Sequence, residues 1–294
     1  MVEELMSTEY HSLLVPTANN LADVEPFIDA YRLNPKATDA DTLQKIIFLG
    51  YLLGWALKWN SSLGLYLPRA FWSRVCYGDE KYVYSLDDLR SMDLFRYNHL
   101  QQLKKDIHTL GHDELKANYE TLTFEADLDS EQRVELVPGG ANIQINKSNI
   151  DDYIAKYLEA YSRLDSLQFR YVMQGILHVC GTPVVQFLTP EVANSRACGP
   201  AKIVFDQFKS SVEVSSKENQ CDYIEDDVYA EFKVKHDITQ EWFWQIVESM
   251  SDKDRQRLLK FWTGRTRLVH DSPLEFRIIQ ENQKDSLPVS NTCA

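Results

Sequence analysis

Residues 46–57 read IIFLGYLLGWAL and form the longest apolar stretch of the chain. A transmembrane helix needs about 20 apolar residues, so this stretch predicts a buried helix of a globular protein instead. In the wider segment 41–59, apolar residues recur at helical spacing around Gly50 and Gly54. Glycine weakens a helix interior and usually has a packing reason there. The pattern therefore predicts a tightly packed helix.

Outward from this stretch, the first half of the chain is predicted to be mostly helical with a small sheet. The clearest further helix spans 150–161, where apolar residues fall at i, i+3, i+4, i+7, i+8 and i+11, and Ser148 with Asp151 supplies a cap-like start. The other expected elements are a helix that carries Phe71, Trp72 and Val75, a helical pattern from Ser85 to Leu103, short strands over 122–128 and 133–137, a turn at 138–140, and a helix from Thr189.

The second half is predicted to mix helices and strands. The helix from Thr189 should end at Gly199-Pro200, because glycine at a helix end followed by proline is a stop signal, and this is the predicted domain boundary. The elements expected beyond it are an acidic loop over 210–227, a strand over 228–234, a helix from Thr239, a helix that Ser251 and Asp254 cap and Gly264 ends, and a strand around 276–279.

The composition fits an ordinary globular protein, with 44% hydrophobic and 26% charged residues. Its formal net charge of −13 argues against nucleic acid as a partner, because phosphate contacts require a basic surface. The same charge argues against docking on anionic membranes. No basic segment followed by an apolar run marks a secretory signal at the N-terminus.

The five cysteines are widely spaced and form no Cys-x-x-Cys pair. We therefore expect neither a disulfide framework nor a zinc site, and we expect a reducing, cytoplasmic location. His108 and His112 have i, i+4 spacing, but Gly111 interrupts the helix, so a surface pair is expected rather than a metal site. The sequence thus implies no metal and no other cofactor.

Several stretches, in the same order and at similar spacing, resemble the HECT domain of ubiquitin ligases. They are LGYLLGWAL at 49–57, LYLPRAFW at 65–72, LVPGGANI at 136–143, FLTPE at 187–191, ACG at 197–199, WFW at 242–244, FWTGR at 261–265 and LPVSNTC at 287–293. The resemblance implies a bilobal α+β fold. Its mostly helical large lobe with a small sheet would span 1–199, and its smaller α/β lobe would span 202–294.

The resemblance also places the catalytic nucleophile at Cys293, which would accept ubiquitin from a conjugating enzyme as a glycyl thioester and pass it to a substrate lysine. Thr292 and Asn291 would donate hydrogen bonds to the thiolate or to the thioester carbonyl. An unperturbed cysteine, with a pKa of about 8.5, is only a few per cent thiolate near neutrality. That suffices for thioester exchange, which is nearly balanced in free energy, so positioning should set its rate.

In the resemblance, the conjugating enzyme docks on a subdomain that corresponds to about 80–137. The apolar candidates for this contact are Leu89, Met92, Leu94, Tyr97 and Phe124. A few such anchors can supply most of an interface's affinity, but each of these residues is equally compatible with a role in the helix core. The lobes would move about a hinge at Gly199, Pro200 and Ala201.

The resemblance predicts lobes that are truncated, since family members have residues ahead of the matching region and a strand and helix after the cysteine. An alternative function is therefore an impaired fragment that binds conjugating enzyme or ubiquitin without transferring it. A third hypothesis is a cysteine hydrolase with His270 as base, but His270 lies in no recognisable active-site pattern.

Overall fold

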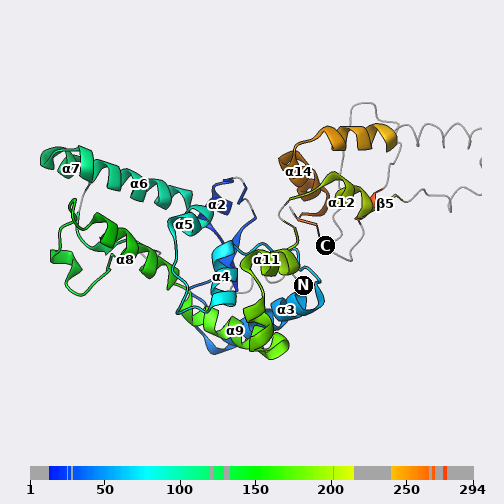
Figure 1. Cartoon of the computed structure of the whole chain (residues 1–294), viewed down its shortest axis with the longest axis horizontal. Helices are drawn as coiled ribbons and strands as arrows, with labels where there is room; N and C mark the ends of the chain where they lie inside the picture. The colour runs from blue at the N-terminus through cyan, green and yellow to red at the C-terminus, as the bar shows by residue number, and fades with distance from the viewer. Residues whose placement is uncertain are drawn as a thin grey trace, which may run out of the picture. The chain divides into compact units, whose positions relative to one another are not determined.

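The computed structural model describes residues 13–24, 26–27, 29–119, 122–128, 133–200, 202–214, 240–264, 267–268 and 274–276. The chain divides into two compact units (Figure 1). The first comprises Met1–Trp59 and Leu65–Asn194, and the second comprises Asn60–Gly64 and Ser195–Ala294. Helices predominate, and the described strands form two-stranded sheets, which confirms the predicted mostly helical α+β class.

The first unit is built on two long helices, α3 (Ala40–Trp59) and α9 (Ser166–Cys180), which pack side by side (Figure 1). Their backbones meet at two glycines. A Cβ on Gly50 would lie 2.2 Å from the carbonyl oxygen of Val172, and a Cβ on Gly175 would lie 2.2 Å from that of Ile47. The predicted tight packing of the 41–59 helix is confirmed, whereas α9 itself is an element that the sequence reasoning missed.

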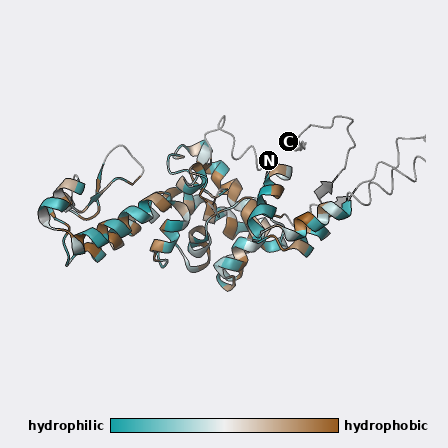
Figure 2. Cartoon of the chain, turned by 90° about the horizontal axis from the view of Figure 1, so that it is seen from above, coloured by the Kyte–Doolittle hydropathy of each residue, from teal (hydrophilic) through white to brown (hydrophobic). Residues whose placement is uncertain are grey.

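Helix α3 has one buried face and one exposed face. Leu49, Leu53 and Leu57 are fully buried, but the apolar stripe at i, i+3, i+7 and i+11 is exposed and consists of Phe48, Tyr51, Trp55 and Trp59. The prediction of a buried helix is therefore wrong for this face, because α9 covers only one side of α3. Figure 2 shows hydrophobic and hydrophilic residues alternating along the helices, as expected where each helix buries one face.

Short elements complete this part of the first unit. They are β1 (Leu14–Pro16), α2 (Ala18–Leu21), β2 (Tyr31–Leu33), α4 (Arg69–Tyr77) and α10 (Thr182–Phe187). Helix α11 (Pro190–Cys198) begins in the first unit and ends in the second. Strands β1 and β2 pair antiparallel, with Leu14 opposite Leu33. The predicted helix with Phe71, Trp72 and Val75 is confirmed as α4, and all three side chains are buried.

The remainder of the first unit forms its own hydrophobic core between α6 and α8, which run next to each other in Figure 1. Its elements are α5 (Leu86–Met92), α6 (Leu94–Thr109), α7 (His112–Asn118), β3 (Glu125–Ala126), β4 (Val134–Glu135), the 3-10 turn η1 (Gly140–Asn142) and α8 (Ile150–Ser162). Strands β3 and β4 pair antiparallel, as the two predicted strands should, but they are shorter than predicted.

Two local predictions in this region are wrong. The helical pattern from Ser85 breaks at Asp93, whose extended backbone (φ −149°, ψ 89°) ends α5 and whose side chain caps α6 by accepting the Arg96 N–H at 2.9 Å. Ser148 does not cap α8, because its hydroxyl donates to Asn146 at 2.6 Å. In both cases a short polar side chain has found a local hydrogen bond other than the expected one.

The second unit contains α12 (Phe205–Ser210), β5 (Val212–Val214), a helix over 240–249, α14 (Asp252–Thr263) and β6 (Leu274–Phe276). The predicted cap of α14 is confirmed, since Ser251 accepts the Asp254 N–H, and Gly264 ends the helix in the left-handed region at φ 74°. The buried core of this unit consists of Ile203, Phe208, Trp244, Val247, Leu259 and Leu268.

The predicted loop over 210–227 is wrong at 212–214, which form β5 and pair in parallel with β6. That pairing depends on a segment far along the chain, so local sequence does not reveal it. The predicted strand at 228–234 and the start of a helix at Thr239 lie outside the described residues. Among the helices that the structure describes, none combines the length and apolar character that a membrane crossing requires.

We predict that Gly175→Ser lowers the free energy of unfolding by about 2 kcal/mol, because the new side chain would overpack the backbone contact with α3. Gly111→Ser is the matched control. Gly111 is the N-cap of α7 at φ −77°, the nearest atom to a Cβ there is 3.8 Å away, and serine is a favourable cap. Urea unfolding followed by circular dichroism measures both, and equal losses would contradict the packing argument.

Candidate functional site

The predicted catalytic residues Cys293, Thr292 and Asn291 lie outside the residues that the structure describes, as do Ala201 and His270. Their roles stay predictions from the sequence. What the structure does describe is the predicted docking region, the segment around Gly199, and the surroundings of three other cysteines.

The predicted docking residues divide into two groups by burial. Leu89, Met92 and Phe124 are 0%, 8% and 3% exposed and belong to the core between α6 and α8. In this conformation they support the surface from beneath, so a partner would not touch them. Leu94 and Tyr97 are half-buried at the start of α6, and these two reach the surface.

Phe95 is an exposed aromatic side chain that the sequence reasoning missed in this region. It lies between Leu94 and Arg96 and is 81% exposed. Helical periodicity selects positions that face the core, so it does not mark a residue on the opposite face of α6. A signal was nevertheless present in the sequence, namely a phenylalanine at a position where the pattern predicts a polar residue.

Arg96 fixes the start of α6 against two neighbouring elements. Its Nε lies 2.9 Å from the Asp93 carboxylate, its Nη1 donates to the Tyr157 hydroxyl at 2.8 Å on α8, and it also donates to the Asp127 carbonyl beyond β3. Burial lowers the pKa of Arg96, but Tyr157 and Asp93 outweigh burial, so the pKa is raised. The cation therefore keeps Leu94, Phe95 and Tyr97 in a defined position.

Asp88 holds the start of α5 in a similar way. Its carboxylate accepts hydrogen bonds from the Tyr82 hydroxyl at 2.6 Å and from the Ser85 N–H and hydroxyl at 2.8 and 2.6 Å. Ser85 and Asp88 thus form a reciprocal capping box. Burial, and then the hydrogen bond to Asp88, raise the pKa of Tyr82, so its phenol stays protonated.

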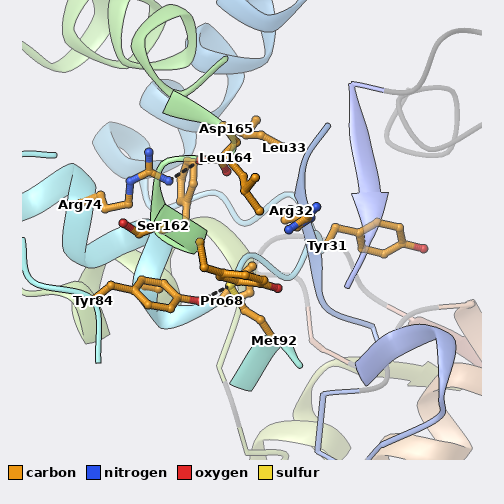
Figure 3. Close-up of a pocket in the computed structure, with 13 residues that line it drawn as sticks. Tyr31, Arg32, Leu33, Pro68, Arg74, Tyr84, Met92, Ser162, Leu164 and Asp165 are labelled. Carbon is orange, nitrogen blue, oxygen red and sulfur yellow. Dashed lines mark hydrogen bonds and ion pairs between the residues drawn. The ribbon is translucent and has the colours of Figure 1, made fainter. Parts of the chain in front are cut away.

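A small cavity lies where α4, α5 and the end of α8 meet (Figure 3). Arg74 is buried beside it, with Nη1 2.6 Å from Asp165 and Nε 2.6 Å from Asp79, and its guanidinium lies 3.9 Å from the centre of the Phe169 ring. The Tyr84 hydroxyl donates to the Met92 sulfur at 2.9 Å (Figure 3).

The groups around this cavity are suited to packing rather than to catalysis. Burial lowers the pKa of Arg74, but Asp165 and Asp79 outweigh it and raise the pKa. Burial raises the pKa of Tyr161 to about 12 and places that of Tyr84 well above its usual value. None of these three groups changes charge near neutral pH, and together they connect the docking region to α4 and α9.

The three described cysteines are buried thiols. Burial raises the pKa of Cys76 to about 11 and also raises that of Cys180, whose sulfur donates to the Gly54 carbonyl at 3.0 Å. Cys198 is fully buried. Because the thiolate is the reactive form, none of the three has the surroundings of a catalytic nucleophile. In the described part of the chain, no His, Cys, Asp and Glu side chains are grouped so as to hold a metal ion.

Gly199, the first residue of the predicted hinge, is held within the second unit. Its φ is +87°, a Cβ there would lie 2.2 Å from the Leu268 carbonyl oxygen, and its own carbonyl accepts a hydrogen bond from Arg267 at 3.0 Å. Pro200 follows in extended or irregular backbone. The predicted hinge role stays a prediction. Glycine is required at 199 because the Leu268 carbonyl leaves no room for a side chain, and not only because glycine has a flexible backbone.

The sequence model of the HECT domain (ubiquitin-transferase) family matches residues 1–294. The chain belongs to the HECT-domain family. It is 27% identical to the E3 ubiquitin-protein ligase HACE1 of Homo sapiens over 78% of the chain, and 28% identical to the E3 ubiquitin-protein ligase hyd of Drosophila melanogaster over 83% of the chain. It spans 23% and 8% of the lengths of these relatives. The predicted resemblance to the HECT domain is thereby confirmed.

Replacing Gly199 by alanine should destabilise the second unit by about 2–4 kcal/mol. Two effects add here, namely the strain of a non-glycine residue in left-handed backbone and the clash with the Leu268 carbonyl. Gly264→Ala serves as the control, because Gly264 has φ +74° but open space around it, and only the strain of about 1 kcal/mol applies. The measurement is urea unfolding of each variant, and a loss at Gly264 as large as at Gly199 would refute the close approach.

Proposed function

We propose that this HECT domain accepts ubiquitin from a conjugating enzyme as a glycyl thioester on Cys293 and passes it to a lysine of a protein substrate. The observation that carries the proposal is the family match over residues 1–294, which includes the LPVSNTC segment. The buried, high-pKa surroundings of Cys76 and Cys180 support it, because they leave those thiols unreactive.

In the first step, the Cys293 thiolate attacks the carbonyl carbon of the thioester between ubiquitin and the conjugating enzyme. A new carbon–sulfur bond forms, and the bond to the conjugating enzyme's sulfur breaks, so that sulfur leaves as a thiolate. Thr292 and Asn291 are placed in sequence to donate hydrogen bonds to the oxygen that gains negative charge. In the second step, a neutral lysine amine attacks the carbonyl carbon of the Cys293 thioester, an amide bond forms, the sulfur leaves as a thiolate, and the amine nitrogen loses one proton to water.

For the conjugating enzyme we propose a docking surface at the start of α6, within region 80–137. Phe95 is its exposed anchor, Leu94 and Tyr97 flank it, and Arg96 holds all three in place. Exposed aromatic side chains on a fixed base are the type of residue that dominates interface affinity.

We propose Gly199, Pro200 and Ala201 as the connection between a large lobe and a small lobe. We also propose the cytoplasm as the location, since a free catalytic thiol needs a reducing compartment.

The direct test is a single-turnover charging assay with ubiquitin-loaded conjugating enzymes, read on non-reducing gels. We expect an adduct that a thiol reductant removes and that Cys293→Ala abolishes. Cys221→Ala is the matched control and should charge normally. If no conjugating enzyme of a broad panel charges the folded chain, or if Cys293→Ala still charges, the assignment of Cys293 is wrong.

The docking surface is tested by Phe95→Ala, which removes an exposed aromatic side chain and should leave the fold intact. An anchor residue contributes about 2 kcal/mol or more, so we expect charging at subsaturating conjugating enzyme to slow by roughly 30-fold. Phe187→Ala on α10 is the control, because Phe187 is 88% exposed on the same unit but lies outside region 80–137. Equal rates for the two variants would exclude Phe95 as an anchor.

A further inference from the structure

The second unit has a surface groove between α12 and the helix over 240–249. Its lining residues are Phe205, Lys209, Gln240, Glu241, Trp244, Gln245 and Glu248. Glu241, Trp244, Gln245 and Glu248 follow at i, i+3, i+4 and i+7, so one face of the helix supplies this wall. Phe205 and Lys209, at i and i+4 on α12, supply the other.

The aromatic floor of this groove holds a cation of the chain itself. The Lys209 ammonium lies 5.6 Å from the centre of the Phe205 ring and 5.7 Å from that of the Trp244 ring, within the range of a cation–π contact. The two rings meet edge to face at 6.2 Å, and Trp244 is 7% exposed, so the core of the unit fixes the floor. Lys209 is itself exposed.

The wall of the groove carries more negative charge than Lys209 neutralises. Within the described part of the chain, no ion pair joins Glu241 or Glu248 to a cation. Arg255 also lies near Phe205, at 5.9 Å, but its guanidinium donates to the carbonyls of Val247, Glu248 and Ile203 and so has a structural role. An aromatic floor with two carboxylates on one wall is complementary to a positively charged side chain.

We propose that this groove binds a basic segment of a partner protein, with a lysine side chain of that segment replacing Lys209 on the Phe205 and Trp244 rings. Glu241 and Glu248 would contact the same ammonium or a neighbouring cation. Lys209 occupies the site in the absence of the partner. The site goes beyond the transfer chemistry proposed for Cys293 and is measured without it, so the failure of one proposal leaves the other standing.

The test uses the full chain and a fluorescently labelled peptide that contains three lysines, with a peptide that has glutamine in their place as the reference. Anisotropy titration at low salt should show binding of the lysine peptide only, and added salt should weaken it. Glu248→Gln should lower affinity about two- to fivefold, as expected for an exposed charge pair. Asp206→Asn is its control, because this exposed α12 carboxylate does not line the groove.

Lys209→Met gives the decisive result. It removes the internal cation, so the lysine peptide should bind about two- to fivefold more tightly, which is the worth of one exposed cation–π contact. Lys202→Met is the control for the change in net charge, since Lys202 is exposed on the same unit and lies outside the groove. The proposal is overturned if Lys209→Met, shown to be folded by circular dichroism, binds no better than Lys202→Met. It is also overturned if Asp206→Asn weakens binding as much as Glu248→Gln.

Discussion

The contact between the backbones of α3 and α9 at Gly50 and Gly175 is the constraint on which the first unit depends. It brings together two segments more than 100 residues apart in the sequence, and it does so at a separation that admits no side chain on either glycine. The chain from 60 to 165 therefore leaves one helix of this pair and returns to the other. The predicted docking region therefore lies in a segment whose two ends are held by this helix pair. Arg74 also joins the two ends of that segment, because it forms ion pairs with both Asp79 and Asp165.

This arrangement explains which parts of the fold could be read from the sequence. Helices α3 and α8 were predictable because their apolar period is a local signal, and α14 was predictable from its Ser251 cap and terminal Gly264 as well. The break at Asp93 was not, since the choice between continuing a helix and capping a new one depends on Asn19, which accepts the Leu94 N–H at 2.7 Å from a distant segment. The pairing of 212–214 with 274–276 was not predictable either, because its two strands are far apart in the sequence.

The candidate site shows a related limit of prediction from sequence. Helical periodicity correctly marks Leu89 and Met92 as core positions, but the period indicates which face of a helix is buried and not which face binds a partner. Phe95 lies outside this period, and its side chain is on the exposed face of α6 and not in the core. The predicted nucleophile rests on a different kind of signal, because no composition or spacing rule separates Cys293 from the other cysteines. Only the likeness of the whole segment to a family does so.

Binding and transfer require opposite charge states of a lysine, and this distinguishes the binding proposed for the groove of the second unit from the reaction proposed at Cys293. A cation–π contact requires the charged ammonium, whereas attack on a thioester requires the neutral amine, which an unperturbed lysine with a pKa of about 10.4 rarely is at pH 7. A lysine held on the Phe205 and Trp244 rings is therefore protected from accepting ubiquitin while it is bound. A basic segment docked there would be positioned by one lysine and modified at another, so the groove would select segments with several cations.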